Sequence, residues 1–276
     1  MVSAREPTNI LTSRRLAITP SRTLFFLPVL VVVLFYAGVL FLTVLNYPPV
    51  RFFSILASPE VREAIVLSLV TATGAGIVAM VLGVPMAYFL ARRDFAGKIV
   101  VDALLDVPVF ISPIAIGALL LVAFSTAQGR WLQEHVGEIV FEVPGIIIAQ
   151  ATIVTALAVR LMKATFEAVP LRYEKVARSL GCTEWNAFWK VVLPLSKSGL
   201  MASAILVWAR ALGEFGATVT LAGATERKTA TIPTSIYLSF ASADVDRALT
   251  LVLILLLVAT ASLIGLRRVA GKTLEI

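Results

Sequence analysis

Charged side chains are scarce in this chain. They make up 15% of its 276 residues, whereas hydrophobic residues make up 59%. Soluble domains carry about a quarter charged residues and fewer than half apolar ones. A water-soluble fold could not bury so much apolar surface, so soluble classes are excluded. Apolar runs of about 20 residues, the length that crosses a bilayer as a helix, recur along the sequence. The composition therefore predicts an all-α membrane protein.

Residues that build catalytic or metal sites are also few. The single cysteine, Cys182, cannot form a disulfide within the chain, and the single histidine, His135, cannot form a zinc or redox cluster. An intramembrane enzyme, the main alternative class, would need a nucleophile with its base or an HExxH motif, and the sequence has neither. Residues 265–273 come nearest to a phosphate-binding loop, but their glycines are spaced one residue too far apart. We expect no catalytic residue, metal or cofactor in this chain.

The net charge of +7 raises the question of a nucleic-acid partner. The basic residues fall in alternate loops, with about sixteen Lys and Arg on the side that holds both termini and about six on the other. This asymmetry is what the positive-inside rule produces. We therefore expect both termini in the cytoplasm, a lipid bilayer around the chain and no nucleic-acid partner.

Six apolar segments are predicted to span the membrane. Residues 1–23 form a polar cytoplasmic arm, and residues 24–45 form the first span, which is too long for the apolar region of a signal peptide and lacks a cleavage site. Residues 61–266 form a transmembrane domain, and residues 267–276 form a cytoplasmic tail. The five spans of the transmembrane domain are expected at 64–91, 99–124 (interrupted by Pro108 and Pro113), 144–162, 198–222 and 248–266.

A polar loop at about residues 168–196 separates the fourth and fifth spans. Apolar residues recur in it at steps of three and four, which is the period of an amphipathic helix: Val176, Leu180, Trp185, Phe188 and Val192. Gly181 predicts a turn between two short helices, and Leu193-Pro194 is expected to end the second helix. An interfacial helix that only anchors the loop is the alternative.

The spacing within this loop resembles the EAA loop of ABC importer permeases. That motif reads Glu-Ala-Ala, three residues, Gly, nine residues, then Ile-x-Leu-Pro. Four residues match it and a fifth is a conservative replacement: Ala177, Gly181, Leu193 and Pro194, with Val191 in place of Ile. Lys175 and Val176 replace the Glu and the first Ala, and Glu174 lies one place early. The resemblance implies a coupling helix that docks on a separate ATPase subunit, which binds the ATP.

A second resemblance lies in the fifth span, where residues 208–217 are similar to the helix 5 sequence of molybdate, tungstate and sulfate permeases. Residues 105–113 and 231–237 also resemble that group, so the similarity extends from Val61 to Leu266. It implies the type I ABC importer permease fold in a prokaryotic inner membrane. It also implies a permease homodimer with two ATPase subunits and an extracytoplasmic oxyanion-binding protein. Molybdate or tungstate is the expected substrate, and sulfate or thiosulfate the alternative.

Two charged residues, Arg210 and Glu214, lie inside the predicted fifth span. They are four residues apart and so share a helix face, where they are expected to pair. Charges within a membrane span usually face the bundle interior or a water path. The pair therefore either belongs to a translocation pathway or gate, or braces the helices, and the sequence does not decide between these roles.

Asp102 and Asp106 are also four residues apart, in the third predicted span. We expect them to be solvated or to pair with a neighbouring helix, because no catalytic partner accompanies them. Arg160 and Lys163, near the end of the fourth span, are expected to reach the headgroups, with attraction of an exiting anion as the alternative.

Overall fold

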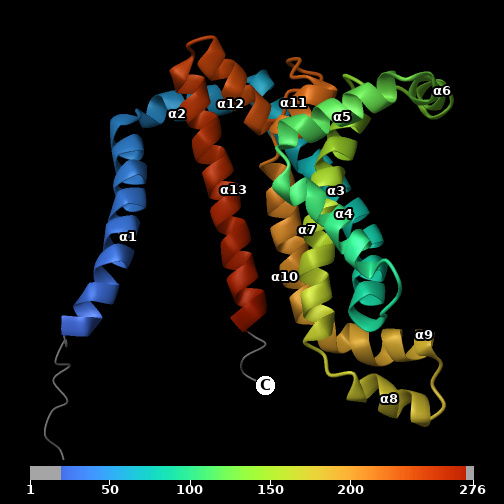
Figure 1. The fold of residues 1–276 in the computed structure, drawn as a ribbon. Coiled ribbons are helices and arrows are strands. Elements are labelled where there is room, and N and C mark those ends of the chain that lie inside the picture. The colour runs from blue at the N-terminus through green and yellow to red at the C-terminus, as the bar shows by residue number, and fades with distance from the viewer. Residues whose placement is uncertain (1–19, 272–276) are drawn as a thin grey trace, which may run out of the picture. The chain divides into compact units, whose positions relative to one another are not determined.

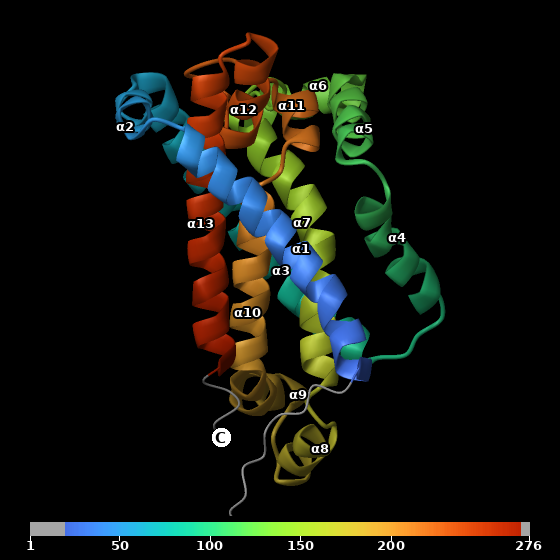
Figure 2. The same cartoon turned by 90° about the vertical axis from the view of Figure 1, so that its left-hand side faces the viewer.

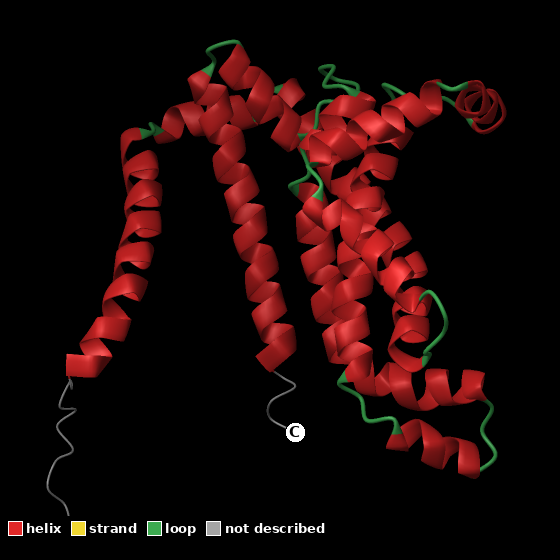
Figure 3. Cartoon of the chain, in the orientation of Figure 1, coloured by secondary structure: helices red, strands yellow, loops and turns green. Residues whose placement is uncertain are grey.

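A computed structural model describes residues 20–271, which are helical with short connections and contain no strand (Figure 3). Most of the expected N-terminal arm and the last five residues of the expected tail lie outside this range. The chain divides into two units, Met1–Phe52 and Phe53–Ile276, which are described separately.

The first unit contains α1 (Pro20–Asn46), which covers the first predicted span. Residues 26–45 are long and apolar enough to cross a membrane, and Pro28 lies inside the helix without ending it. A short helix, α2 (Pro49–Leu56), follows and runs across the boundary between the units. This helix was not predicted from the sequence.

Four long helices form the bundle of the second unit (Figures 1 and 2): α3 (Pro59–Arg92), α7 (Val143–Glu167), α10 (Leu193–Leu212) and α13 (Val245–Gly271). Proline occupies the first turn of α3, α7 and α10, where its missing N–H costs no helical hydrogen bond. The core contains many alanines, which allow close helix packing: Ala72, Ala75 and Ala79 in α3, with Ala151 and Ala158 in α7.

The third predicted span is a bent pair of helices. α4 (Lys98–Phe110) and α5 (Pro113–Ser125) meet at 109°, so the described residues contain five candidate spans, or six if this pair counts as one. Only Pro113 interrupts the segment, because it forces an extended backbone on Ser112. The predicted interruption at Pro108 was wrong: this proline lies in the last turn of α4, and the helix continues to Phe110.

The fifth predicted span is shorter than expected. α10 ends at Leu212, and a separate helix, α11 (Gly216–Ala222), follows after a break, so a continuous helix to residue 222 was wrong. At the same end of the bundle lie two more short helices, α6 (Ala127–Val136) and α12 (Ile232–Ala241) (Figure 1).

Two short helices cross the opposite end of the bundle: α8 (Arg172–Ser179) and α9 (Glu184–Ala187) (Figures 1 and 2). A π-helical turn, η1 (Phe188–Val192), joins α9 to α10. The prediction that Leu193-Pro194 ends the second helix was therefore wrong. Pro194 lies in the first turn of α10, a position that tolerates a missing N–H, and the helical path continues through it.

Candidate functional site

The α8–α9 segment, residues 168–192, is the first part of the candidate site. α8 ends in a Schellman motif in which the N–H of Cys182 donates to Ala177 O (3.1 Å) and that of Gly181 to Arg178 O (3.0 Å). Gly181 has a φ of +90°, which accounts for the glycine. Thr183 then caps α9 by accepting a hydrogen bond from the N–H of Asn186. The predicted turn at Gly181 is therefore formed by local hydrogen bonds.

The residues that match the EAA motif differ in position and burial, and Leu193 and Pro194 already belong to α10. Ala177 is buried, Val191 and Leu193 are half-buried, and Pro194 is exposed in the first turn of α10. Only Gly181 lies at the outer turn, where no heavy atom would come within 4 Å of an added Cβ. These residues shape the segment.

Large apolar side chains are exposed on the segment, among charged residues such as Lys175 and Arg178. Val176, Leu180 and Trp185 are 58%, 80% and 68% exposed, and Leu171, Tyr173 and Trp189 are exposed as well. Phe188 and Val192, which belong to the same sequence pattern, are buried against the bundle. The segment therefore has an inner face that packs on the bundle and an outer apolar face that has the character of a docking surface.

The contacts of Glu174 were not predicted from the sequence. Glu174 is 7% exposed and forms an ion pair with Arg92, the last residue of α3. Tyr88 donates a hydrogen bond to its second carboxylate oxygen over 3.0 Å. Its position one place before the EAA pattern distinguishes it in the sequence, but that position does not show that the carboxylate faces α3.

The second part of the candidate site is the break between α10 and α11. Arg210 Nη1 lies 2.6 Å from Glu214 Oε2, so the expected pair forms. Glu214 is 1% exposed and lies beyond the end of α10, not within a helix as predicted. Its other oxygen, Oε1, accepts a hydrogen bond from the N–H of Ala217 and thereby caps α11. One buried carboxylate therefore connects the end of α10 to the start of α11.

Glycines bring α11 close to α5. A Cβ on Gly216 would lie 2.9 Å from Ile114 N, and one on Gly117 would lie 2.8 Å from the Cα of Ala217. Gly216 and Gly117 therefore allow a close approach of two helices within this chain. Gly213 is exposed, and an added Cβ there would meet only its own helix's carbonyls at 3.8 Å or more.

Two ion pairs connect α4 to α7. Lys163 Nζ lies 2.9 Å from Asp102 Oδ1, and Arg160 Nε lies 3.2 Å from Asp106 Oδ1. The expected pairing of the aspartates with a neighbouring helix is thus observed, and their partners are the cations expected to reach the headgroups. In the nearby α3–α4 connection, a hydrogen bond from Lys98 lowers the pKa of the exposed Asp94 carboxyl.

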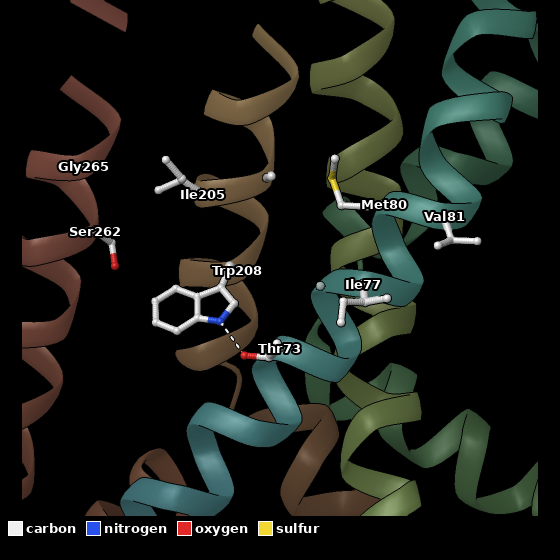
Figure 4. Close-up of a pocket in the computed structure, with 10 residues that line it drawn as sticks. Thr73, Ile77, Met80, Val81, Ile205, Trp208, Ser262 and Gly265 are labelled. Carbon is white, nitrogen blue, oxygen red and sulfur yellow. Dashed lines mark hydrogen bonds between the residues drawn. The ribbon is translucent and has the colours of Figure 1, made fainter. Parts of the chain in front are cut away.

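A pocket of about 540 Å³ lies between α3, α10 and α13. Figure 4 shows the indole of Trp208 and the hydroxyl of Ser262 pointing into it, and the indole N–H donates to Thr73 Oγ1 over 3.1 Å. Its other lining residues are small or apolar, and they include Gly76, Ile77 and Ala204. No charged side chain lines it, so an oxyanion would find no counter-charge there. Among residues 20–271, no cluster of His, Cys, Asp or Glu could hold a metal ion.

Comparisons with known proteins place the chain among transport components. Residues 79–272 match the family described as the binding-protein-dependent transport system inner membrane component. The molybdenum transport system permease protein ModB of Haemophilus influenzae is 34% identical over 178 residues, which cover 63% of this chain and 78% of that protein. The molybdate/tungstate transport system permease protein WtpB of Thermococcus kodakarensis is 38% identical over 160 residues, which cover 58% and 60%.

Solved structures show the same fold. A bacterial alginate ABC transporter in complex with its alginate-bound periplasmic protein contains a chain that matches with a TM-score of 0.72 at 17% identity, over 93% of this chain and 96% of that one. An inward-facing MetNI methionine ABC transporter matches with a TM-score of 0.57 at 17% identity, over 77% and 99%. At this identity the likeness concerns the fold, and it confirms the predicted permease architecture.

Proposed function

Because the chain belongs to the family of binding-protein-dependent transport system inner membrane components, we propose that it is the permease of an ABC importer that moves molybdate or tungstate into the cytoplasm. The relatives named for molybdenum, molybdate or tungstate transport support this substrate class. The chain is a transporter subunit and not an enzyme, and ATP hydrolysis belongs to a separate subunit. An ATPase and an extracytoplasmic binding protein are its partners.

The outer apolar face of the α8–α9 segment is the observation that carries the coupling role. Val176, Leu180 and Trp185 are exposed on the segment, and the turn at Gly181 joins the two helices that carry them. Helices of this kind bind by placing apolar side chains in a groove of the partner. In the proposal, Ala177, Val191, Leu193 and Pro194 shape the segment that receives ATP-driven closure from the ATPase. This end of the bundle then faces the cytoplasm, as do both termini.

We further propose that two copies of the chain form the pathway, with two ATPase subunits. The pocket around Trp208 supports this pairing, because Ala204 and Gly265 leave room for close approach of a helix from the second copy. Two copies would each supply one half of a path between them, in a transmembrane domain formed by residues 61–266.

Arg210 and Glu214 are proposed as a gate in this pathway. Glu214 is buried and engages both Arg210 and the start of α11, so separation of these elements would leave a buried carboxylate without partners. Breaking a fully buried charge pair costs about 3–5 kcal/mol, and the exposure of Arg210 makes the cost smaller here. The guanidinium of Arg210 is 40% exposed and could meet an anion once the pair opens.

Uptake by reconstituted vesicles tests the proposed function. Permease, ATPase and binding protein are assembled in vesicles, and entry of molybdate, tungstate and sulfate is measured with and without ATP inside. The proposal predicts ATP-dependent entry of molybdate or tungstate only when the binding protein is present. Entry without ATP would indicate a passive channel, and selective entry of sulfate would contradict the assigned substrate. Calorimetric titration of the binding protein with the three anions gives an independent measure of selectivity.

A further inference from the structure

α3 ends at Arg92, and this residue and the adjacent Arg93 contact both arms of the α8–α9 segment. Arg92 Nε lies 2.5 Å from Glu174 Oε1 in α8. Arg93 Nη2 lies 2.5 Å from Glu184 Oε1 in α9. These contacts lie on opposite sides of the turn at Gly181, so a single helix end holds the segment in two places.

The contact of Arg92 is the buried one. The side chains of Arg92 and Glu174 are 8% and 9% exposed, whereas the Arg93–Glu184 pair is about half exposed and open to screening by salt. Arg92 Nη2 also donates to Val169 O over 2.9 Å, just after the end of α7. Tyr88 donates to the second carboxylate oxygen of Glu174, so both oxygens have partners.

Aromatic packing adds to this connection. The ring of Tyr88 lies 4.6 Å from that of Phe188 in η1 and 5.6 Å from that of Phe166 in α7, measured between ring centroids. Tyr88 and Arg92 are four residues apart and share a face of α3. One turn of α3 therefore contacts α7, α8 and η1.

The covalent connection from α9 to α10 is less rigid than the contact between α3 and the segment. It passes through the π-helical turn Phe188–Val192 and then Pro194, which has no N–H for the helical ladder. Such π-turns and prolines are the usual places where helices bend. A displacement of the segment would therefore be absorbed in part at this bend before it reaches α10.

We propose that Arg92, Glu174 and Tyr88 form a clamp that makes the α8–α9 segment move with α3, so that α3 transmits the ATPase's closure into the bundle. The inference rests on the proposed coupling role of the segment. Glu174 is then a positioning residue: its carboxylate faces α3 and not the partner. The groups of the outer apolar face bind the ATPase, and the clamp transmits the resulting displacement.

The variant Glu174→Gln tests the clamp in the complete complex of permease, ATPase and binding protein. It keeps the size of the side chain and removes the charge that Arg92 requires. We expect normal amounts of complex, unchanged basal ATP hydrolysis, and stimulation by loaded binding protein reduced roughly tenfold, within the range of measured coupling effects. Glu167→Gln is the matched control, because Glu167 is an exposed carboxylate at the same end of the bundle, outside the segment. Its stimulation should equal that of the wild type.

A covalent replacement of the clamp distinguishes transmission from simple structural support. In a Cys182→Ser background, Arg92→Cys and Glu174→Cys are introduced together and joined with a short bifunctional thiol reagent. Stimulation should be low before cross-linking and restored after it, because α3 and α8 again move as one.

Three results would overturn the proposal: wild-type stimulation in Glu174→Gln, loss of the ATPase subunit from that complex, or cross-linked complexes that stay unstimulated. The importer assignment itself is tested separately: it fails if the wild-type complex shows no ATP-dependent uptake of the anion.

Discussion

Replacement of Gly181 by valine is the most direct test of the segment's docking role. Gly181 has a φ of +90°, and no heavy atom lies within 4 Å of the position that a Cβ would take. The substitution therefore causes no collision, and its cost is confined to the backbone conformation. That cost is about 1–3 kcal/mol for a residue held in a sparsely populated region. About 1.4 kcal/mol corresponds to a factor of ten in an equilibrium constant. The equilibrium constant for forming the turn therefore falls roughly 5- to 150-fold.

The affinity of the ATPase subunit for the permease should report this change. A binding site that is populated for only part of the time has its apparent affinity reduced by that fraction. In nanodiscs, Gly181→Val should weaken association by up to the same factor while the spans remain inserted. Gly181→Asn should lose much less affinity for the ATPase subunit, because asparagine tolerates positive φ better than a β-branched residue.

Gly97 supplies the matched control. Its φ is +91°, no heavy atom lies within 4 Å of an added Cβ, and it precedes α4 outside the α8–α9 segment. Gly97→Val therefore carries the same backbone strain and should leave ATPase association unchanged. Equal losses in both variants would attribute the effect to general destabilisation. Wild-type association and anion uptake in Gly181→Val would refute the docking role.

Three further predictions concern topology, the gate and the α5–α11 interface. A cysteine introduced beside Lys228 should react with an impermeant reagent from outside the cell, whereas native Cys182 should not. Exchange of Arg210 and Glu214 should abolish transport as fully as either single change if they gate, because the cation that meets the anion would then lie at the buried position 214; transport near the wild-type rate would refute the gate. Gly216→Val should lower the free energy of unfolding of the permease by about 1–3 kcal/mol through overpacking.

The labelling and the Gly216 measurement each have a simple control. Labelling of both cysteines from the same side would contradict the assigned orientation, and Cys182→Ser identifies the native thiol's share of the signal. Gly213→Ala is the partner of the Gly216 variant, since its added Cβ would make only ordinary contacts. Equal stability changes at the two glycines would contradict the packing argument.

The spans could be predicted because their signal is local and strong. A run of about 20 apolar residues has few alternatives to a membrane helix, and α1, α3, α7 and α13 each cover a predicted segment. The turn at Gly181 was predictable for a related reason, since glycine between two amphipathic patterns favours a positive φ. In each case neighbouring residues were sufficient.

Contacts between distant residues were not predictable in this way. Arg92 and Glu174 are separated by 82 positions, and the spacing of the EAA pattern does not reveal which side of α8 faces the bundle. Whether a proline ends a helix could not be predicted from the sequence either. Pro108 and Pro194 both lie within helical paths, because a proline near a helix end removes few hydrogen bonds.

The break after α10 shows why the pairing of Arg210 with Glu214 was predicted while its geometry was not. A spacing of four residues brings the two charges together in a continuous helix, and the turn after Leu212 also brings them together. In the observed geometry Glu214 lies beyond the end of α10, and its second carboxylate oxygen accepts from the N–H of Ala217. The position of α11 depends in turn on Gly216 and Gly117, which let it approach α5. A displacement of α5 would therefore move the group that holds Glu214, so the state of the proposed gate depends on α5 as well as on α10.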